Sequence, residues 1–459
     1  MVVGTASHAG KSWFATAICR SLRRRGLRVA PFKAQNMSNN SYPCKEGGEI
    51  GRAQVAQAEA CGLEASASMN PILLKPNSET GSQVIVDGKP WRTLSAREYY
   101  EHFEYLNSRV MAAYSRLAAE YEYIVMEGAG SVTEVNLKRT DLVNLGLARR
   151  VGAPALLVAD IDRGGVFASL VGTFALLEPE EMALVRSFAI NRFRGDVSLF
   201  EDGVAFLENK TERKCLGVFP HAPDIHLDAE DSVSLDGAPR GNGRVAIVRF
   251  PRISNITDFS CVPNAVWIEH PTGIRFEAVI LPGSKNVIGD LQWMRSRGLD
   301  RWVLAQHAAG ARVIGVCGGY QILGERIDDP FQVESAAGSA EGLGLLPVTT
   351  TLEREKTTRI VEAETPGGRR FTAYEIHAGR TSIPSGAEPF AMAGMQPEGM
   401  RSGRVMGTYL HGAFEDPVVL EEMLGEVCAA RESKDAMYDR LADWFERNAD
   451  MRRFEELYL

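Results

Sequence analysis

The sequence predicts an α/β protein of two domains, each built around a mainly parallel sheet. Up to residue 230, short apolar runs alternate with helical stretches, which is the pattern of β-α-β units. Residues 232–244 are then rich in Gly, Pro, Ser and Asn, and a new strand pattern follows them. The length of 459 residues also exceeds that of a typical single domain. We therefore expect one domain over residues 1–231, a linker over 232–243 and a second domain over 244–459.

Each expected element follows from local periodicity. The charged, amphipathic tail over residues 434–459 is expected to form a helix that packs on the second domain. Residues 13–25 have the period of a helix in the first domain. Apolar runs predict strands at residues 1–3, 27–32, 123–126, 155–160, 188–191 and 217–219 of the first domain, and at 245–250, 278–281 and 313–316 of the second.

Composition and charge exclude several classes of protein. With 45% hydrophobic and 24% charged residues, the chain is typical of a soluble globular protein. It has no apolar run long enough to span a membrane and no signal-peptide pattern, so we expect a cytoplasmic protein without a membrane partner. The net charge of −8 does not favour nucleic acid as a partner. The seven cysteines include no CxxC pair, which argues against a zinc ribbon, a thioredoxin-type site and a disulfide framework.

A phosphate-binding loop is predicted at the N-terminus. The segment GTASHAGKS lies between a predicted strand and a predicted helix, so its backbone N–H groups and the helix N-terminus can bind phosphate. Five residues, rather than the standard four, separate its two glycines. A partition-type ATPase would carry a lysine where Thr5 stands. The lysine of the loop can reach the β- and γ-phosphates, and the serine hydroxyl can bind Mg²⁺. The residues expected to bind ATP are Gly4, Thr5, Gly10, Lys11, Ser12, Lys33 and Asn191.

Carboxylates end two of the predicted strands. Glu127 follows the strand at residues 123–126, and the carboxyl ends of parallel strands face the ligand crevice, so Glu127 is expected to bind Mg²⁺ together with the loop serine. Asp160 and Asp162 end another strand, just before Arg163. These three are candidates for binding the substrate. The two aspartates can also bind metal or cap a helix, and the sequence leaves these alternatives open.

A reactive cysteine is predicted in the second domain. The pentapeptide GVCGG follows a predicted strand and opens a helix, which is the pattern of a nucleophile elbow with Cys317 at its tip. The helix N-terminus favours a thiolate, and the N–H groups of Gly318 and Gly283 are candidates for an oxyanion hole. A thiol nucleophile also needs a base. His411 is the first candidate for that base and His377 the second.

The cysteine elbow and the histidine resemble those of the class I glutamine amidotransferases. The resemblance implies that Cys317 takes the amide of glutamine as a thioester and releases ammonia. In most of that family the third member follows the histidine as His-x-Glu, but Ala413 stands at that place. The departure is typical of the amidotransferases that act on cobyrinic acid. Glu375 and Glu415 are the candidates for orienting His411.

The first domain resembles dethiobiotin synthetase, whose phosphate loop also has five intervening residues and which uses ATP to activate a carboxylate. The fusion of the two halves is similar to the glutamine-hydrolysing amidotransferases of cobalamin biosynthesis, over nearly the whole chain. The segments that carry this resemblance are PFKAQNM (31–37), EIGRAQ (49–54), MNPILLKP (69–76), ADIDRGGVF (159–167) and LPGSKN (281–286).

This resemblance implies that ATP, Mg²⁺ and glutamine are used to amidate the b, d, e and g carboxylates of adenosylcobyrinic acid a,c-diamide, a corrinoid. It also suggests Glu49 as a second Mg²⁺ ligand, with Asp160 as the alternative. A synthase that makes the a,c-diamide itself is the second candidate. A regulatory P-loop ATPase with an inactive amidotransferase-like domain is the third, although an intact Cys317 and His411 argue against it. Basic residues that could bind so acidic a substrate are Lys75, Arg139, Arg163 and Arg192.

Overall fold

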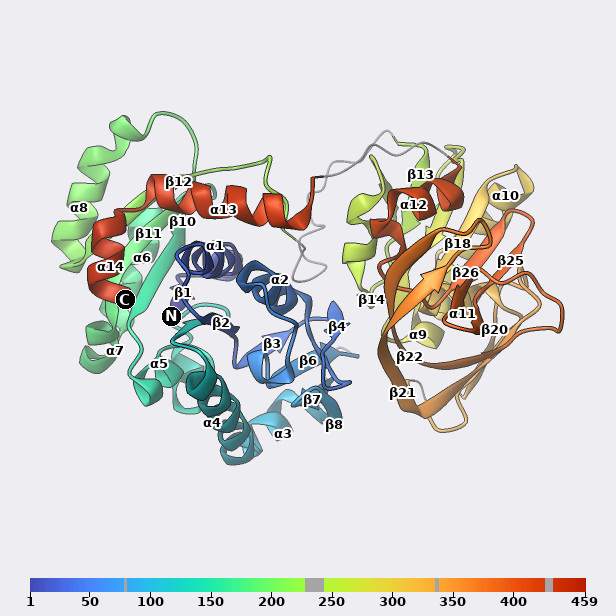
Figure 1. Ribbon diagram of the computed structural model, residues 1–459, viewed down its shortest axis with the longest axis horizontal. Coiled ribbons are helices and arrows are strands. Elements are labelled where there is room, and N and C mark those ends of the chain that lie inside the picture. The colour runs from blue at the N-terminus through green and yellow to red at the C-terminus, as the bar shows by residue number, and fades with distance from the viewer. Residues whose placement is uncertain (78–80, 228–242, 335–337, 426–431) are drawn as a thin grey trace.

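The computed structural model describes residues 1–77, 81–227, 243–334, 338–425 and 432–459, which form two α/β domains side by side (Figure 1). The predicted linker over 232–243 lies almost wholly outside these ranges. Within them, no helix is both long and apolar enough to cross a membrane.

A parallel sheet forms the centre of the first domain, and all six strands predicted there are confirmed. Four strands pair in the order β1-β10-β11-β12, and a bridge between Val2 and Glu127 joins β1 to the parallel pair β2-β9. Val2 packs in the core that contains α1, whereas Val3 packs in the core that contains α6. Helices therefore cover both faces of the sheet, as a parallel sheet requires. The strands are β1 (Val2–Gly4), β2 (Val29–Phe32), β9 (Tyr123–Met126), β10 (Ala155–Asp160), β11 (Val185–Phe193) and β12 (Lys214–Pro220).

Helices connect these strands and cover the sheet. The helix predicted over residues 13–25 is confirmed as α1, which begins directly after the glycine-rich loop. The helices of this domain are α1 (Lys11–Arg24), α2 (Arg52–Cys61), α3 (Ala96–Glu101), α4 (Phe103–Glu120), α5 (Leu145–Val151), α6 (Val166–Leu176), α7 (Pro179–Leu184) and α8 (Glu201–Thr211).

Six short strands between β2 and α3 were not predicted. They form a four-stranded sheet in the order β3-β6-β7-β8 and the hairpin β4-β5. Polar residues interrupt the apolar pattern of these strands, so the sequence pattern does not indicate them. Several of these polar side chains are buried at the boundary with the second domain. The strands are β3 (Gln35–Met37), β4 (Ser41–Pro43), β5 (Glu49–Gly51), β6 (Ile72–Pro76), β7 (Gly81–Val86) and β8 (Lys89–Ser95).

The second domain has a six-stranded sheet in the order β15-β13-β16-β18-β26-β25, in which only the pair β25-β26 is antiparallel. The three predicted strands are confirmed as β13, β16 and β18. A long hairpin, β21-β22, belongs to a separate sheet. The central elements are β13 (Val245–Val248), β15 (Val266–Ile268), β16 (Ala278–Leu281), α9 (Val287–Ser296), α10 (Leu299–Ala308), β18 (Arg312–Val316), α11 (Gly318–Leu323), β25 (Met400–Ser402), β26 (Val405–Thr408) and α12 (Pro417–Leu424). The others are β14 (Ile253–Ser254), β17 (Gly283–Ser284), β19 (Arg326–Asp328), β20 (Ser339–Glu341), β21 (Thr349–Glu364), β22 (Arg370–Ser382), β23 (Ala391–Ala393) and β24 (Gln396–Glu398).

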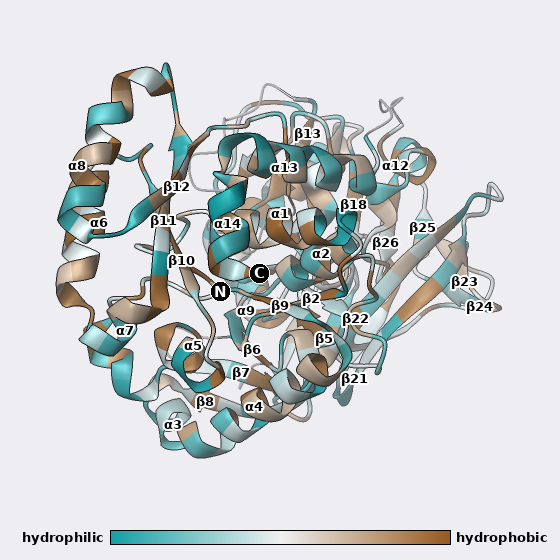
Figure 2. Ribbon diagram, turned by 60° about the vertical axis from the view of Figure 1, so that its left-hand side comes forward, coloured by the Kyte–Doolittle hydropathy of each residue, from teal (hydrophilic) through white to brown (hydrophobic). Residues whose placement is uncertain are grey.

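The C-terminal tail is helical, but the prediction that it packs on the second domain is wrong. Helices α13 (Lys434–Asn448) and α14 (Met451–Tyr458) lie beside α1 and β12 of the first domain (Figure 1). Tyr438, Leu441 and Phe445 share a core with Phe14 of α1. The outward faces of α13 and α14 are largely hydrophilic (Figure 2). Amphipathic periodicity shows that one face of a helix is buried, but it does not show which surface covers that face.

Complementary charges fix α13 on α1. Arg20 donates to Asp439 at 2.8 Å and to Asp435 at 2.9 Å, and Arg24 donates to Asp443 at 2.6 Å. The Asp439 carboxylate raises the pKa of Arg20, whose guanidinium is mostly buried. Each buried aromatic side chain of the tail contributes roughly 1.5–3 kcal/mol. The tail is therefore an integral part of the first domain, although it is the last segment of the chain.

Candidate active sites

The glycine-rich loop has the backbone geometry of a phosphate site. Gly10 precedes α1 with φ at 107°, a left-handed conformation that favours glycine. A Cβ on Gly10 would also overlap the Asn191 amide. That amide donates from Nδ2 to the Ala9 carbonyl at 2.9 Å. Asn191, near the end of β11, therefore stabilises the conformation of the loop at which it was predicted to bind ATP.

Lys11 lies folded into this loop. Its Nζ donates to the carbonyl of Ala6 at 2.9 Å and to that of Gly130 at 2.8 Å, and the side chain is mostly buried. The ammonium is thus held by carbonyls on both sides of the crevice. A phosphate in the loop would find a buried cation and the N-terminus of α1 together, which are the groups that bind phosphate.

Glu127 collects the polar side chains at the base of the crevice. Its Oε1 accepts from Ser12 Oγ at 2.8 Å and from Lys33 Nζ at 2.9 Å, and its Oε2 accepts from Gln57 Nε2 at 2.5 Å. The structure thus brings together Ser12 and Glu127, which were predicted to share Mg²⁺, and adds Lys33, which was predicted to bind ATP. A hydroxyl beside a carboxylate is a donor set that suits Mg²⁺. Among the described residues, no three His, Cys, Asp or Glu side chains are grouped so that they could hold a metal ion by themselves, so phosphate and water would complete the ligand set here.

Glu49, the suggested second metal ligand, lies elsewhere. Its Oε1 accepts from Lys356 at 2.6 Å, and its Oε2 accepts from Lys75 at 2.8 Å and from Ser41 at 2.7 Å. Burial raises the pKa of Glu49, but the two lysines outweigh it and hold that pKa well below the ordinary value. Burial lowers the pKa of Lys75 to about 7, although the Glu49 carboxylate opposes the shift. Both oxygens of Glu49 are therefore taken by cations at the domain boundary.

The proposed substrate residues at the end of β10 make local ion pairs. Asp160 accepts from Arg192 at 2.8 Å, and Asp162 accepts from Arg194 at 2.6 Å. Neither aspartate caps α6, whose N-cap is Gly165. Asp160, Asp162 and Arg163 are not among the described residues that line the cavities beside the loop.

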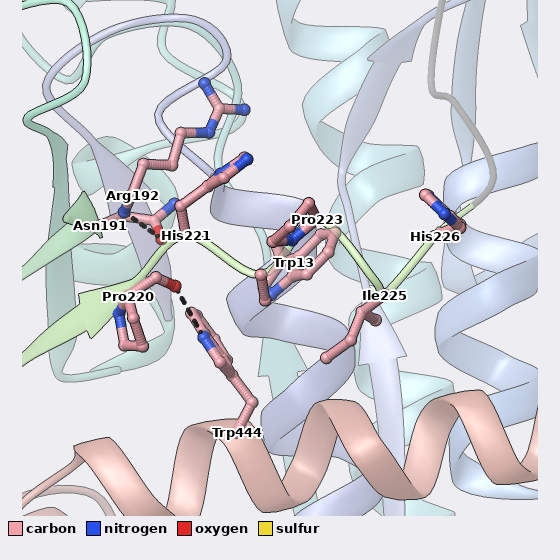
Figure 3. A pocket seen from close by; sticks show the side chains of 11 residues that line it. Trp13, Asn191, Arg192, Pro220, His221, Pro223, Ile225, His226 and Trp444 are labelled. Carbon is pink, nitrogen blue, oxygen red and sulfur yellow. Dashed lines mark hydrogen bonds between the residues drawn. The ribbon is translucent and has the colours of Figure 1, made fainter. Parts of the chain in front are cut away.

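Two cavities flank the loop. The larger, of about 400 Å³, extends from Lys11 and Lys33 to Lys138. The smaller, of about 250 Å³, begins at Gly10. Figure 3 shows it lined by Trp13, His221 and, from α13, Trp444. Trp444 donates from Nε1 to the Pro220 carbonyl at 2.9 Å, so the tail forms part of the wall of this cavity.

Cys317 occupies a strained turn between β18 and α11. Its φ of 52° and ψ of −108° lie outside the regions that a non-glycine residue ordinarily adopts. The Cys317 N–H donates to the Thr408 carbonyl at 2.7 Å, and the thiol faces the Ile376 carbonyl at 3.7 Å. A Cβ on Gly319 would overlap the backbone of Leu281, so only glycine fits after the elbow. This is the geometry of a nucleophile elbow.

His411 is oriented by Asp258, which the sequence did not predict. His411 Nδ1 lies 2.6 Å from Asp258 Oδ2, and the other carboxylate oxygen accepts from the Gly412 N–H at 2.9 Å. Nε2 is buried and has no hydrogen-bond partner among the described residues. Burial alone would lower the pKa of His411, but Asp258 and the Cys317 thiol together raise it to about 10. Asp258 and Cys317 are thus the two groups that favour the imidazolium form of His411.

Neither residue that was expected to orient His411 does so. Glu375 pairs with Arg359, and Glu415 accepts from Arg52 at 3.2 Å. The second-choice base, His377, has its Nδ1 2.7 Å from the Gly379 carbonyl and stacks on Tyr409. Asp258 lies in the short 3-10 helix η5 (Ile256–Cys261), 153 positions before His411. No spacing rule connects residues so far apart.

A cavity of about 80 Å³ opens at Cys317. Gly318 and Ser284 line it, and an ideal Cβ on Gly318 would lie 2.8 Å from the Ser284 nitrogen. The predicted oxyanion segment, which includes Gly283, therefore packs against the elbow. Lys75 and Gln83 of the first domain line the same cavity, so both domains shape it.

These two sites define a class of protein: a P-loop nucleotide-binding domain joined to a glutamine amidotransferase domain. The family model for the CobQ/CobB/MinD/ParA nucleotide binding domain matches residues 1–234, and that for the CobB/CobQ-like glutamine amidotransferase domain matches residues 244–418. The cobyric acid synthase of Mycolicibacterium vanbaalenii is 46% identical, covering 98% of this chain and 94% of its own. The cobyric acid synthases of Jannaschia sp. (47%; 91% and 89% covered) and Dehalococcoides mccartyi strain 195 (41%; 100% and 97%) are similar. The chain belongs to the cobyric acid synthase family.

Proposed function

We propose that the protein uses ATP and glutamine to amidate the b, d, e and g carboxylates of adenosylcobyrinic acid a,c-diamide. The observation that carries this proposal is the presence of both sites in one chain: a loop with Lys11 folded into it and Ser12 bonded to Glu127, and a strained elbow at Cys317 in the domain that holds the His411–Asp258 pair. Similarity to cobyric acid synthases over the full length supports the choice of substrate. ATP and glutamine are intracellular metabolites, so we place the reaction in the cytoplasm.

The second domain would release ammonia from glutamine. The Cys317 proton passes to His411 Nε2, and the thiolate attacks the side-chain carbonyl of glutamine. His411 then protonates the leaving nitrogen, which departs as ammonia and leaves a thioester. Water hydrolyses the thioester to glutamate and restores the thiol. Asp258 keeps His411 in the tautomer that presents Nε2 to the sulfur.

The first domain would activate the acceptor carboxylate. A substrate carboxylate attacks the γ-phosphate of ATP, giving an acyl phosphate and ADP, and ammonia then displaces phosphate to form the amide. Lys11 neutralises charge on the transferred group. Ser12 and Glu127 would hold Mg²⁺, which supplies charge neutralisation at the β- and γ-phosphates.

The two cavities suggest where the substrates lie. We assign the nucleoside end of ATP to the cavity at Trp13, His221 and Trp444, because it begins at Gly10 of the loop and offers aromatic faces to a base. We assign the acceptor carboxylate to the larger cavity, because Lys33 and Lys138 supply positive charge beside Lys11.

Mass spectrometry of the corrinoid product tests this function. The purified enzyme is incubated with ATP, Mg²⁺, glutamine and adenosylcobyrinic acid a,c-diamide, and the amides added are counted. Amidation at b, d, e and g supports the proposal. Activity only on cobyrinic acid at positions a and c would identify an a,c-diamide synthase, and ATP hydrolysis without amidation would identify a regulatory ATPase.

Asp258→Asn is expected to lower kcat/KM for glutamine hydrolysis by roughly 10³-fold, because the amide favours the wrong tautomer of His411. Asp258 raises the pKa of His411, so the variant should lose the imidazolium at lower pH than wild type. The high-pH limb of the glutaminase profile should therefore move to lower pH. A pH profile of glutamate release measures both effects. A wild-type profile would contradict the role of Asp258, and unchanged amidation with ammonia serves as the folding control.

Glu127→Gln is expected to lower amidation by roughly 10²-fold with either nitrogen source, because it keeps the shape but removes the charge that holds Mg²⁺. Partial recovery at high Mg²⁺ is expected, since the defect lies in binding. A Mg²⁺ titration of the amidation rate measures the effect. An unchanged Mg²⁺ dependence would contradict the assignment, and Glu122→Gln, which alters an exposed carboxylate of the first domain paired with Arg28, is the matched control.

A further inference from the structure

Strand β4 of the nucleotide-binding half lies against the element that carries Asp258. The Ser41 N–H donates to Asn255 Oδ1 at 3.1 Å, and the Ile256 N–H donates to Asn40 Oδ1 at 2.9 Å. Asn255 is the N-cap residue of η5, and its carbonyl accepts from the Asp258 N–H. The two domains are therefore joined at the start of the helix that orients His411.

A stack of planar groups continues this contact to the imidazole. The Tyr42 ring lies 4.5 Å from that of Tyr374, and the Tyr374 ring stacks on His411 at 5.2 Å and 24°. Two backbone hydrogen bonds, of 2.8 and 3.0 Å, also join Tyr374 to His411. The Arg52 guanidinium lies 4.9 Å from the centre of the Tyr42 ring. Arg52 and Tyr42 belong to the first domain, whereas Tyr374 and His411 belong to the second.

Ion pairs across the domain boundary flank this stack. Ser41 Oγ donates to Glu49, and Glu49 accepts from Lys356 of the second domain at 2.6 Å. Arg52 donates to Glu415 of the second domain at 3.2 Å. Arg52 is also the first residue of α2, the helix whose Gln57 donates to Glu127. Helix α2 therefore connects the stack, at Arg52, to the nucleotide site, at Gln57.

We propose that Tyr42 is a positioning residue for glutamine hydrolysis, supplied by the nucleotide-binding half: through Tyr374 it fixes the His411 ring in the orientation that accepts the Cys317 proton. This inference rests on the proposed function of the glutaminase site. Tyr42 does not line the cavity at Cys317 among the described residues, so its effect falls on the rate rather than on glutamine binding. Aromatic pairs of this geometry have measurable coupling.

Tyr42→Leu tests the proposal in the full-length enzyme. We expect kcat for glutamine hydrolysis to fall about tenfold, the upper end of what one aromatic pair contributes, with KM changed by less than about twofold. Amidation with ammonia should stay within about twofold of wild type, because it bypasses Cys317. Tyr42→Phe keeps the ring and should restore the rate of hydrolysis. Tyr42→Met replaces the leucine variant if that variant is unstable.

Tyr105→Leu is the matched control. The Tyr105 ring stacks on Trp91 with the ring centres 4.8 Å apart, and this pair lies away from both sites, so the variant should leave every rate unchanged. Three results would overturn the inference. They are unchanged glutamine hydrolysis in Tyr42→Leu, an equal fall of the glutamine-dependent and ammonia-dependent rates in that variant, and a Tyr42→Phe variant that hydrolyses glutamine as slowly as Tyr42→Leu. Glutamate release is measured without reference to the corrinoid. A wild type that hydrolyses glutamine but adds no amides would therefore overturn the proposed function and leave the comparison of Tyr42 variants intact.

Discussion

Replacing Cys317 by alanine is expected to abolish glutamine-dependent amidation and to leave ammonia-dependent amidation at the wild-type rate. The loss should be roughly 10⁴-fold or more, since no other group can form the thioester. The strained elbow presents Cys317 to the cavity, and Cys317 is the one cysteine among the described residues that line it. Free ammonia enters the reaction after this step, so the rate of ammonia-dependent amidation in the first domain should not change. Product amides are counted with glutamine and, separately, with ammonium salt.

The matched control for this prediction is Cys215→Ala, which removes a buried free thiol from the first domain. It should keep both nitrogen sources active. Glutaminase activity retained in Cys317→Ala would refute the assignment of the nucleophile. Loss of ammonia-dependent amidation as well would show that Cys317 also serves the synthetase reaction.

Lys11→Ala is expected to remove amidation with either nitrogen source, by roughly 10³-fold. Lys11 is the buried cation of the loop, held between the carbonyls of Ala6 and Gly130, and both nitrogen sources need the acyl phosphate that it helps to form. Glutamine hydrolysis should survive, because Cys317 lies in the other domain. ADP release and glutamate release, followed in parallel, separate the two activities.

Lys214→Ala is the control for charge, because it removes an exposed lysine paired with Glu208. It should amidate as wild type does. Normal ammonia-dependent amidation by Lys11→Ala would refute the role of the loop. The two variants, Lys11→Ala and Cys317→Ala, should therefore show complementary defects.

Sequence spacing could identify the functional residues that lie within a single strand-loop-helix unit, because their neighbours along the chain determine their chemistry. Lys11 and Ser12 lie in a strand-loop-helix unit, and Cys317 lies in another. Glu127 was predictable because the carboxyl ends of parallel strands meet at one edge of a sheet. For these residues the sequence predicts both the element and the position of the side chain on it, and the structure brings Ser12 and Glu127 together.

Other predictions failed or were absent because tertiary contacts decide them. The amphipathic tail carries a buried face, yet only the arginines of α1 and the core around Phe14 explain why α13 lies on the first domain. The ion pairs of Glu49 with Lys75 and Lys356 were likewise absent from the predictions, and the suggested role of Glu49 as a second Mg²⁺ ligand stays a prediction.

By itself, the sequence determined the two α/β domains, the phosphate loop and the cysteine elbow, because each depends on residues that are neighbours along the chain. The tertiary structure alone decided which carboxylate orients His411 and which residues of the first domain support it. Asp258 precedes His411 by 153 positions, and Tyr42 reaches the imidazole through Tyr374 of the other domain. Contacts between residues so distant in the chain are set by how the domains pack, and no periodicity or spacing in the sequence records that packing.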